Sequence, residues 1–192
     1  MAQPSLPSDP SAVYRRLLDE SEARVELIGG EVVVHAAPGL GHAFGAAAVG
    51  ADLYQAYQRG RGGPGGWWIL PEVDVELDAA HKYRPDVAGW RCERVSKIPS
   101  ERPVRVVPDF VCEVLSPTNA EWDLGPKRAG YARAGVPWYW SLDPEAQRLE
   151  AFELDGNHFR SIGVVTRETP GALRPFDAVV IDMGEVFPIG GG

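Results

Sequence analysis

Two apolar runs on either side of a helix-length segment constrain the fold of this chain more than any other feature. The runs FVCEVL at 110–115 and VPWYWSLD at 136–143 are apolar on both faces, which is typical of strands covered on both sides of a sheet. Between them, a helical pattern extends from about Asp123 to Ala134, and Gly135 ends it. Because parallel strands need a crossover of about this length, the order predicts an α/β (α+β) fold with a mixed sheet flanked by helices.

The remaining segments predict elements around this sheet. A short helix extends to Asp19, with Ser8 or Asp9 as its cap and Pro10 in its first turn. RVELIGGEVVV predicts an N-terminal hairpin, and GHAFGAAAVGADLYQAYQ predicts a helix that packs closely on the sheet. WWILPEVDVELD predicts one strand, with YRPDVAGW as its antiparallel partner. The segments RLEAFELDGNHFRSI and onward to Phe187 predict C-terminal hairpins.

Length and composition limit the class of protein. The 192 residues, 44% of them hydrophobic, predict one domain over 10–188 with flexible termini at 1–9 and 189–192. No run is long enough to span a bilayer and the first residues lack a hydrophobic signal core, so we expect a cytoplasmic protein without a membrane partner. Cys92 and Cys112 have neither zinc nor disulfide spacing, and Cys112 is expected to be buried. The formal charge of −8 argues against broad attachment to nucleic acid, so a polyanionic substrate would need a basic cleft, bound metal, or both.

Glu113 is the carboxylate inside the apolar run FVCEVL, and it needs a compensating group. Asp109 lies four residues earlier, roughly 13 Å along a strand, which is too far to share an ion. Asp86, after Pro85 in RPDVAGW, is the candidate that a neighbouring strand brings opposite Glu113. Two converging carboxylates need a proton or a divalent cation between them. Mg²⁺ fits because it takes one or two carboxylates and keeps waters for a phosphate substrate.

A nearby cation would complete such a site. The position two residues after Glu113 points the same way along the strand, but Leu115 occupies it. Lys127, in the following helix, is the alternative if that helix packs back on the strand. Its ammonium would stabilise charge or activate water.

These pieces resemble a known family. The Pro-Asp on one strand, the Glu on the next and a nearby Lys resemble the PD-(D/E)XK nuclease superfamily. VELIGGEVV, YRPDVAGW, PDFVCEVLSPTN and WDLGPKRAGYARAGVPWYWSLDP are similar to the Uma-two family of restriction endonucleases within it. The resemblance covers roughly residues 10–188. It implies a metal-dependent endonuclease that hydrolyses DNA, with Asp86 and Glu113 holding Mg (or Mn) and Lys127 as a relocated catalytic lysine. It also implies a role for Glu26 as a water-mediated or outer contributor, whereas Leu115 departs from the superfamily pattern.

Other polar residues have simpler interpretations. Glu72, Asp74 and Glu76 alternate as on a strand with one wet face, although Glu72 or Asp74 can approach the cleft. His42 at a helix start suggests a cap or packing role, and Tyr131 one turn after Lys127 suggests a core position.

Three functions stay open at this level. The first is the Mg-dependent deoxyribonuclease, and the second is a catalytically inactive binding or accessory module with the nuclease fold. The third is a hydrolase of another phosphate ester, since no base-reading element is visible. A homodimer is plausible because a duplex has two strands to cut.

Overall fold

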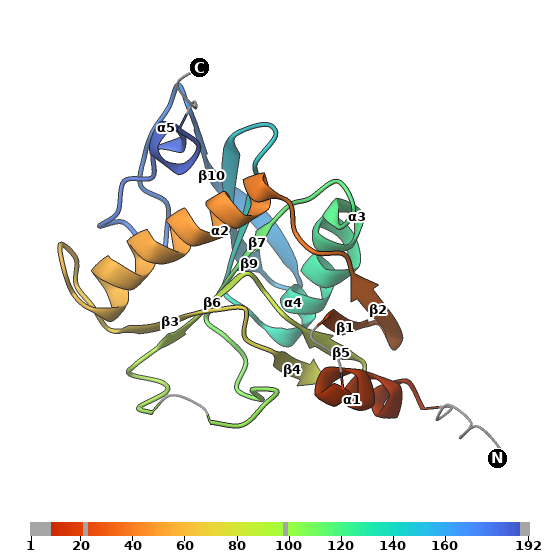
Figure 1. The fold of residues 1–192 in the computed structure, drawn as a ribbon. Coiled ribbons are helices and arrows are strands. Elements are labelled where there is room, and N and C mark those ends of the chain that lie inside the picture. Colours follow the sequence, from red (N-terminus) through yellow and green to blue (C-terminus); the bar gives the residue numbers. More distant parts are fainter. Residues whose placement is uncertain (1–8, 21–22, 98–99, 189–192) are drawn as a thin grey trace, which may run out of the picture.

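The computed structural model describes residues 9–20, 23–97 and 100–188, and its strands form two sheets (Figure 1). The six-stranded sheet has the order β10-β9-β8-β7-β6-β3. Its strands are β3 (Trp67–Pro71), β6 (Val87–Arg91), β7 (Phe110–Val114), β8 (Trp138–Asp143), β9 (Arg148–Asp155) and β10 (His158–Thr166). Strands β7 and β8 are parallel and their neighbours are antiparallel, which confirms the mixed sheet and the crossover.

The four-stranded sheet is antiparallel and has the order β2-β1-β5-β4. Its strands are β1 (Arg24–Ile28), β2 (Glu31–His35), β4 (Val75–Asp78) and β5 (His81–Tyr83). The β1–β2 pair is the predicted N-terminal hairpin, and Gly29 and Gly30 adopt positive φ at its turn.

Helices cover both faces of the larger sheet. Helix α2 (Leu40–Leu53), continued by the π-helical segment η1 (Tyr54–Gln58), packs on one face (Figure 1). Close contact is possible at Gly45, where a Cβ atom would lie 2.7 Å from Leu142 Cδ2. The other face packs against α4 (Arg128–Ala134) and part of the smaller sheet. Helices α1 (Pro10–Glu20) and α5 (Met183–Val186) cover the smaller sheet and the C-terminal region respectively.

The crossover between β7 and β8 consists of α3 (Ala120–Trp122), the π-helical segment η2 (Asp123–Lys127) and α4. Pro126 lies inside η2 and has no N–H to donate, which disfavours regular α-helical hydrogen bonding there. Gly135 ends the crossover with φ 81°, as the sequence predicts. The expected helix is therefore present, although it starts earlier and has an irregular turn that carries Lys127.

Three expectations are wrong in detail. The single strand expected over 67–78 is divided between the sheets, because Glu72 adopts φ 48° after Pro71 and turns the chain from β3 to β4. Asp74, expected on a wet face, is 4% exposed because it pairs with Arg84 and Arg102. The hairpin β9–β10 is confirmed, but the chain beyond it holds an isolated bridge between Gly171 and Ile181 and then α5.

The ends of the chain are only partly described. Asp9 accepts a hydrogen bond from the Ser11 amide at 3.1 Å, whereas Ser8 lies outside the described residues. Residues 1–8 and 189–192, which cover nearly all of the two segments expected to be flexible, also lie outside them. Within the described part of the chain, no helix has the length and apolar character needed to cross a membrane.

Candidate active site

Asp86 and Glu113 meet where β6 and β7 lie side by side. Val87 pairs with Cys112 in the antiparallel register, so Asp86, one residue before β6, lies beside Glu113. Asp86 Oδ2 accepts a hydrogen bond from the Val114 amide at 2.7 Å. Both side chains are buried, at 1% and 0% exposure. The sheet therefore brings together the two acids that the sequence singled out.

Arg24 joins these two acids. It lies on β1, with Nη1 2.6 Å from Asp86 Oδ1 and Nη2 3.4 Å from Glu113 Oε2. Nη2 also donates to the Arg84 carbonyl. Sequence reasoning missed Arg24, although it lies two residues before Glu26 and therefore on the same strand face.

Lys127 reaches Glu113 from η2, with Nζ 2.9 Å from Glu113 Oε1. It also lies 2.8 Å from Asp123 Oδ1 and 3.1 Å from Glu26 Oε1. Asp123 was not predicted, although its i, i+4 spacing to Lys127 is typical of helical ion pairs. At 1% exposure, Lys127 is an interior ammonium held by three carboxylates.

Two tyrosines, one from α4 and one from β5, pack on the side of Glu113 that faces the protein interior. Tyr131 donates a hydrogen bond of 2.6 Å to Glu113 Oε1, so this residue of α4 belongs to the site as well as to the core. Tyr83 packs edge-on against Tyr131, with ring centroids 5.0 Å apart. Gly130 permits this approach, since a Cβ there would lie 2.1 Å from the Tyr83 hydroxyl.

Glu26 occupies the β1 side of the cluster, and it is fully buried. Its Oε1 accepts a hydrogen bond of 2.6 Å from the Arg84 amide, and its Oε2 lies 2.6 Å from His35 Nε2. Lys127 pairs with both Glu26 and Glu113 and so connects the two acids. The resemblance implied such an outer position for Glu26.

His42 lies in the first turn of α2 beside Asp86. Its Nε2 is 3.2 Å from Asp86 Oδ2, and its ring is 6% exposed. The residue is therefore packed against the site, in a role that the sequence described only as capping or packing.

The other acids considered lie elsewhere. Asp109 pairs with Arg94 and accepts from the Arg91 amide at 2.8 Å, as its distance along the strand requires. Glu72 borders a pocket of about 370 Å³ that is also lined by Arg24, His35 and Arg84. This pocket opens the Arg24 side of the cluster to solvent.

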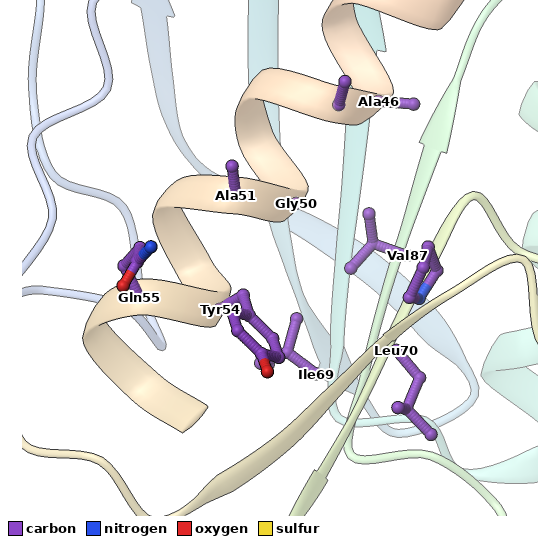
Figure 2. Close-up of a pocket in the computed structure, with 10 residues that line it drawn as sticks. Ala46, Gly50, Ala51, Tyr54, Gln55, Ile69, Leu70 and Val87 are labelled. Atoms are coloured by element: carbon purple, nitrogen blue, oxygen red, sulfur yellow. The ribbon is translucent and has the colours of Figure 1, made fainter. Parts of the chain in front are cut away.

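A second, apolar pocket of about 380 Å³ lies between α2 and β3 (Figure 2). Its lining includes Ala46, Gly50 and Ala51 from the helix and Ile69, Leu70 and Val87 from the strands, which Figure 2 labels. Its lining residues carry no charge, so it does not suit a phosphodiester.

The protonation of the acids follows from burial and from their neighbours. Burial raises the pKa of Glu113 to about 8; Asp123 and Asp86 add to the increase, and Lys127 and Arg24 oppose it. For Glu26, burial is the largest effect and raises the pKa, but Lys127, His35 and Arg24 together hold it well below its usual range. The pKa of Asp86 is also lowered, because His42, Arg24 and the Val114 amide together outweigh its burial. The two meeting acids therefore differ, as expected for like charges at one site.

We define the charge cluster as the carboxylates of Glu26, Asp86, Glu113 and Asp123 with the cations of Arg24 and Lys127. With neutral histidines and all four acids ionised, these four acids and two bases have a formal excess of two negative charges; the raised pKa of Glu113 reduces this excess to one at neutral pH. Carboxylate oxygens are the ligands that Mg²⁺ prefers, and one or two are sufficient when water and phosphate complete its shell. The cluster therefore suits a divalent cation in donor chemistry and in charge.

Position limits this fit. Each oxygen of Asp86 and Glu113 already faces a cation or an N–H or O–H donor. Arg24 is the group that bridges them, so a shared ion requires its displacement. Among the described residues, no group of three or more His, Cys, Asp or Glu is arranged to hold a metal. Asp86 and Glu113 are the two acids that the β6–β7 register places side by side.

Comparisons with known proteins agree with this architecture. The sequence profile of the Uma2 family, described as "Putative restriction endonuclease", matches residues 12–182. The chain belongs to this family. A crystal structure of a protein described as a putative nuclease belonging to DUF820, from Anabaena variabilis, is similar with a TM-score of 0.71 and 15% identity. The similarity covers 91% of this chain and 96% of that one, and it shows the restriction-endonuclease-like fold. No curated protein matches the chain.

Proposed function

We propose that this Uma2-family protein is a metal-dependent endonuclease that hydrolyses DNA phosphodiester bonds at the charge cluster. The observation that carries the proposal is the meeting of Asp86 and Glu113 at adjacent strand positions, beside a pocket lined by Arg24 and Arg84. Family membership supports nuclease chemistry, and the basic pocket wall supports an anionic substrate.

Asp86 and Glu113 are the proposed ligands of Mg²⁺, with Mn²⁺ as a substitute. When bound, such an ion polarises the phosphoryl group and offsets the charge that develops on it. The Val114 amide fixes the Asp86 carboxylate, and Tyr131 and Lys127 fix that of Glu113. Both ligands would thus be held in place before the substrate arrives.

Lys127 and Glu26 are proposed as positioning residues in this arrangement. Lys127 is 1% exposed and is surrounded by carboxylates, so its ammonium sets the orientation and charge of Glu113. Glu26 in turn holds Lys127 at 3.1 Å. Arg24 borders the open pocket, so its guanidinium would be able to contact a phosphate oxygen if a bound cation took its place between the two acids.

Cleavage of duplex DNA with Mg²⁺ or Mn²⁺ tests this function. We expect the wild type to cut plasmid and linear DNA, and Asp86→Asn to reduce the rate at least about 100-fold. Asp155→Asn, at the exposed β9–β10 turn, is the matched control and should cut like the wild type. Equal cutting by Asp86→Asn would contradict the proposal, and metal binding without DNA cleavage would favour the hydrolase of another phosphate ester.

A second candidate is a nuclease-fold module without catalytic activity. The bridge from Arg24 to both Asp86 and Glu113 favours it, because a permanent cation already joins the acids. Leu115, at the position where the superfamily pattern has a lysine, also favours the inactive module. DNA binding without cleavage, together with no metal binding, would support this candidate.

We also propose that the chain forms a homodimer through the outer face of α2. Leu40 and Phe44 are 80% and 58% exposed on this face, and Ala47 and Ala51 are also exposed. The outer face of α2 thus has large side chains near its N-terminus and small ones, beside the apolar pocket, near its C-terminus. In an antiparallel pair of identical helices, the large side chains of each copy would meet the small ones of the other. The helix has no charged residue before Asp52, so two copies of this acidic chain can meet there without repulsion.

The solution mass tests the dimer. Light scattering should give twice the chain mass for the wild type, and Phe44→Glu should give a monomer. Val164→Glu, at another exposed apolar position, should leave the mass unchanged. A monomeric wild type would contradict the dimer while leaving the nuclease proposal intact.

A further inference from the structure

We propose that a third pocket, between α1 and the smaller sheet, binds a backbone phosphate of the DNA strand that extends beyond the charge cluster. This α1 pocket measures about 340 Å³ and lies where α1 meets β4 and β5 (Figure 1). Its charged lining residues are Arg15, Asp19, Glu76, Lys82, Arg102 and Arg105. The inference rests on the proposed nuclease function, because it names a second contact for the same substrate.

The α1 pocket concentrates positive charge on an acidic chain. Four cations and two carboxylates line it, which gives a formal charge of +2, whereas the whole chain carries −8. The buried Asp74 pairs with Arg102, but Arg84 pairs with the same carboxylate and balances its charge. A concave surface lined by an excess of one charge focuses the field, so an anion is attracted here although the chain as a whole repels DNA.

These cations have donors that the fold does not use. Lys82 is 3% exposed and has one carboxylate partner among the described residues, Glu76, whose Oε1 lies 3.3 Å from Nζ. An ammonium has three N–H donors, so two are left for a ligand. Arg15 is exposed and has no ion pair within the described part of the chain, and Arg105 approaches Glu76 only to 3.5 Å. A buried ammonium with exposed guanidinium groups around it suits a phosphate.

Asp74 connects the α1 pocket to the pocket beside the charge cluster. Its Oδ1 lies 2.7 Å from Nε of Arg84, which lines the pocket beside Arg24. Its Oδ2 lies 2.6 Å from Nε of Arg102, which lines the α1 pocket. The two arginines therefore flank one carboxylate, and their guanidinium groups form a basic track between the pockets.

This continuity favours DNA over a small anion as the occupant of the α1 pocket. Each strand of a duplex carries a phosphate about every 3.4 Å along the helix axis. A strand with its scissile phosphate at the Arg24 pocket can therefore follow the track and place another phosphate in the α1 pocket. That second phosphate does not react, so its contact contributes to binding rather than to the chemical step.

Two double variants form a matched pair. Arg15→Gln with Arg105→Gln reduces the formal charge of the α1 pocket from +2 to zero. Both side chains are exposed, so the fold should be retained. Arg59→Gln with Arg61→Gln removes the same charge from two exposed positions in the loop after η1, which lies away from α1 in Figure 1.

The first measurement is a titration of the full chain with inorganic phosphate, without metal, followed by amide NMR. We expect the amides of Arg15, Lys82 and Arg105 to shift in the wild type. The dissociation constant measured from the α1 pocket should be at least about tenfold weaker in the Arg15/Arg105 variant and unchanged in the Arg59/Arg61 variant. Unshifted amides at this pocket in the wild type, or equal binding by the two variants, would overturn the inference.

Lys82→Gln tests the buried donor separately. It removes the ammonium, while Arg105 still pairs with Glu76. Phosphate binding at the α1 pocket should weaken in a variant whose melting curve shows that it is folded. Unchanged binding in this folded variant would contradict the proposed role of the pocket interior.

The second measurement identifies the source of the phosphate. With Ca²⁺ and duplex DNA, the Arg15/Arg105 variant should bind about tenfold more weakly than the wild type, with a salt slope smaller by about one. With Mg²⁺ its KM should rise about tenfold while kcat stays within about twofold, because uniform binding is lost. If phosphate binding is lost but DNA affinity and KM are unchanged, the pocket holds a free phosphate compound and the inference about DNA is wrong.

The same data separate this inference from the nuclease proposal. Cleavage that depends on Asp86 but is equal in the Arg15/Arg105 variant and the wild type would refute the α1 pocket alone. DNA binding that is lost in the variant, together with no cleavage by the wild type, would refute the nuclease proposal and support the DNA contact.

Discussion

Arg24 lies 2.6 Å from Asp86, so a permanent cation stands where the two site acids would share a metal ion. Its second nitrogen reaches Glu113 at 3.4 Å, and its side chain also lines the pocket that opens to solvent. A divalent cation at these carboxylates would therefore compete with Arg24. The proposed catalytic centre requires the cation to win this competition, whereas a structural ion-pair network requires Arg24 to stay in place.

Arg24→Gln tests the competition. Without metal, the variant should lose about 3–5 kcal/mol of unfolding free energy, because Asp86 is left buried without its cation. With Mg²⁺ it should gain more thermal stability than the wild type, since the ion replaces the lost charge. Melting curves with EDTA and with Mg²⁺ measure both effects. A metal response smaller than that of the wild type would show that Arg24 does not compete.

Glu113→Gln tests the ligand role at nearly constant shape. The amide should still accept from Tyr131, so the fold should be retained, but it is a poorer Mg²⁺ ligand than a carboxylate. We expect the rise in melting temperature with Mg²⁺ or Ca²⁺ to be lost, together with DNA cleavage. Glu121→Gln, an exposed change in α3, serves as the control. A full metal response in Glu113→Gln would exclude Glu113 as a ligand.

Lys127→Met should be among the most destabilising substitutions in the chain. It removes the ammonium from three carboxylates at 2.8 to 3.1 Å in the interior. Leaving buried charges unpaired costs about 3–5 kcal/mol. Lys97→Met, at an exposed site, should change stability by less than about 0.5 kcal/mol. Urea denaturation of both variants gives the comparison, and similar stabilities would show that the cluster is less buried than described.

The raised pKa of Glu113 predicts a pH dependence. Its pKa is about 8 in the native state, against an ordinary value of 4.5, so between these values the native state holds a proton that the unfolded chain has lost. The free energy of unfolding of the metal-free protein should therefore fall as pH rises from about 4.5 to about 8. Glu26 and Asp86 have lowered pKa values, and their stabilisation is lost only as pH falls through the acid range.

Denaturation at several pH values between about 5 and 8 measures this trend. Glu113→Gln removes the titrating group, so its stability should vary less over the same range. An equal slope in the variant and the wild type would assign the pH dependence to another group.

Gly130→Ala tests the close packing of α4 behind the cluster. The new methyl would meet the buried Tyr83 hydroxyl at 2.1 Å, so the helix must shift, at about 1–3 kcal/mol. Gly125→Ala, where nothing lies within 4 Å, should be neutral or slightly stabilising. Thermal melts of the two variants check this difference. Equal melting temperatures for the two variants would mean that the Tyr83 side chain moves aside without destabilising the fold.

The sequence predicted the part of the site that depends on strand pattern. Apolar runs and the length of the crossover indicated the β7–β8 pair, and an acid inside such a run pointed to Asp86 as its neighbour. The pattern could not place groups whose position depends on tertiary packing. Arg24 belongs to the smaller sheet, whereas Asp86 and Glu113 lie at the larger one. No local sequence signal specifies how the two sheets are placed relative to each other.

The division of the segment 67–78 shows a second limit. Alternation over Glu72, Asp74 and Glu76 is the same for one strand and for two that belong to different sheets. The break depends on the positive φ of Glu72, which is uncommon for a residue other than glycine. Asp74 is buried because Arg84 and Arg102 converge on it from other segments.

A crystal soaked in Mn²⁺ and measured by anomalous scattering shows whether Asp86 and Glu113 share a metal ion. We expect one strong peak within coordination distance of both Asp86 and Glu113, with the Arg24 guanidinium moved away from them. A map in which Arg24 still bridges the two acids, and no peak lies between them, would contradict this expectation.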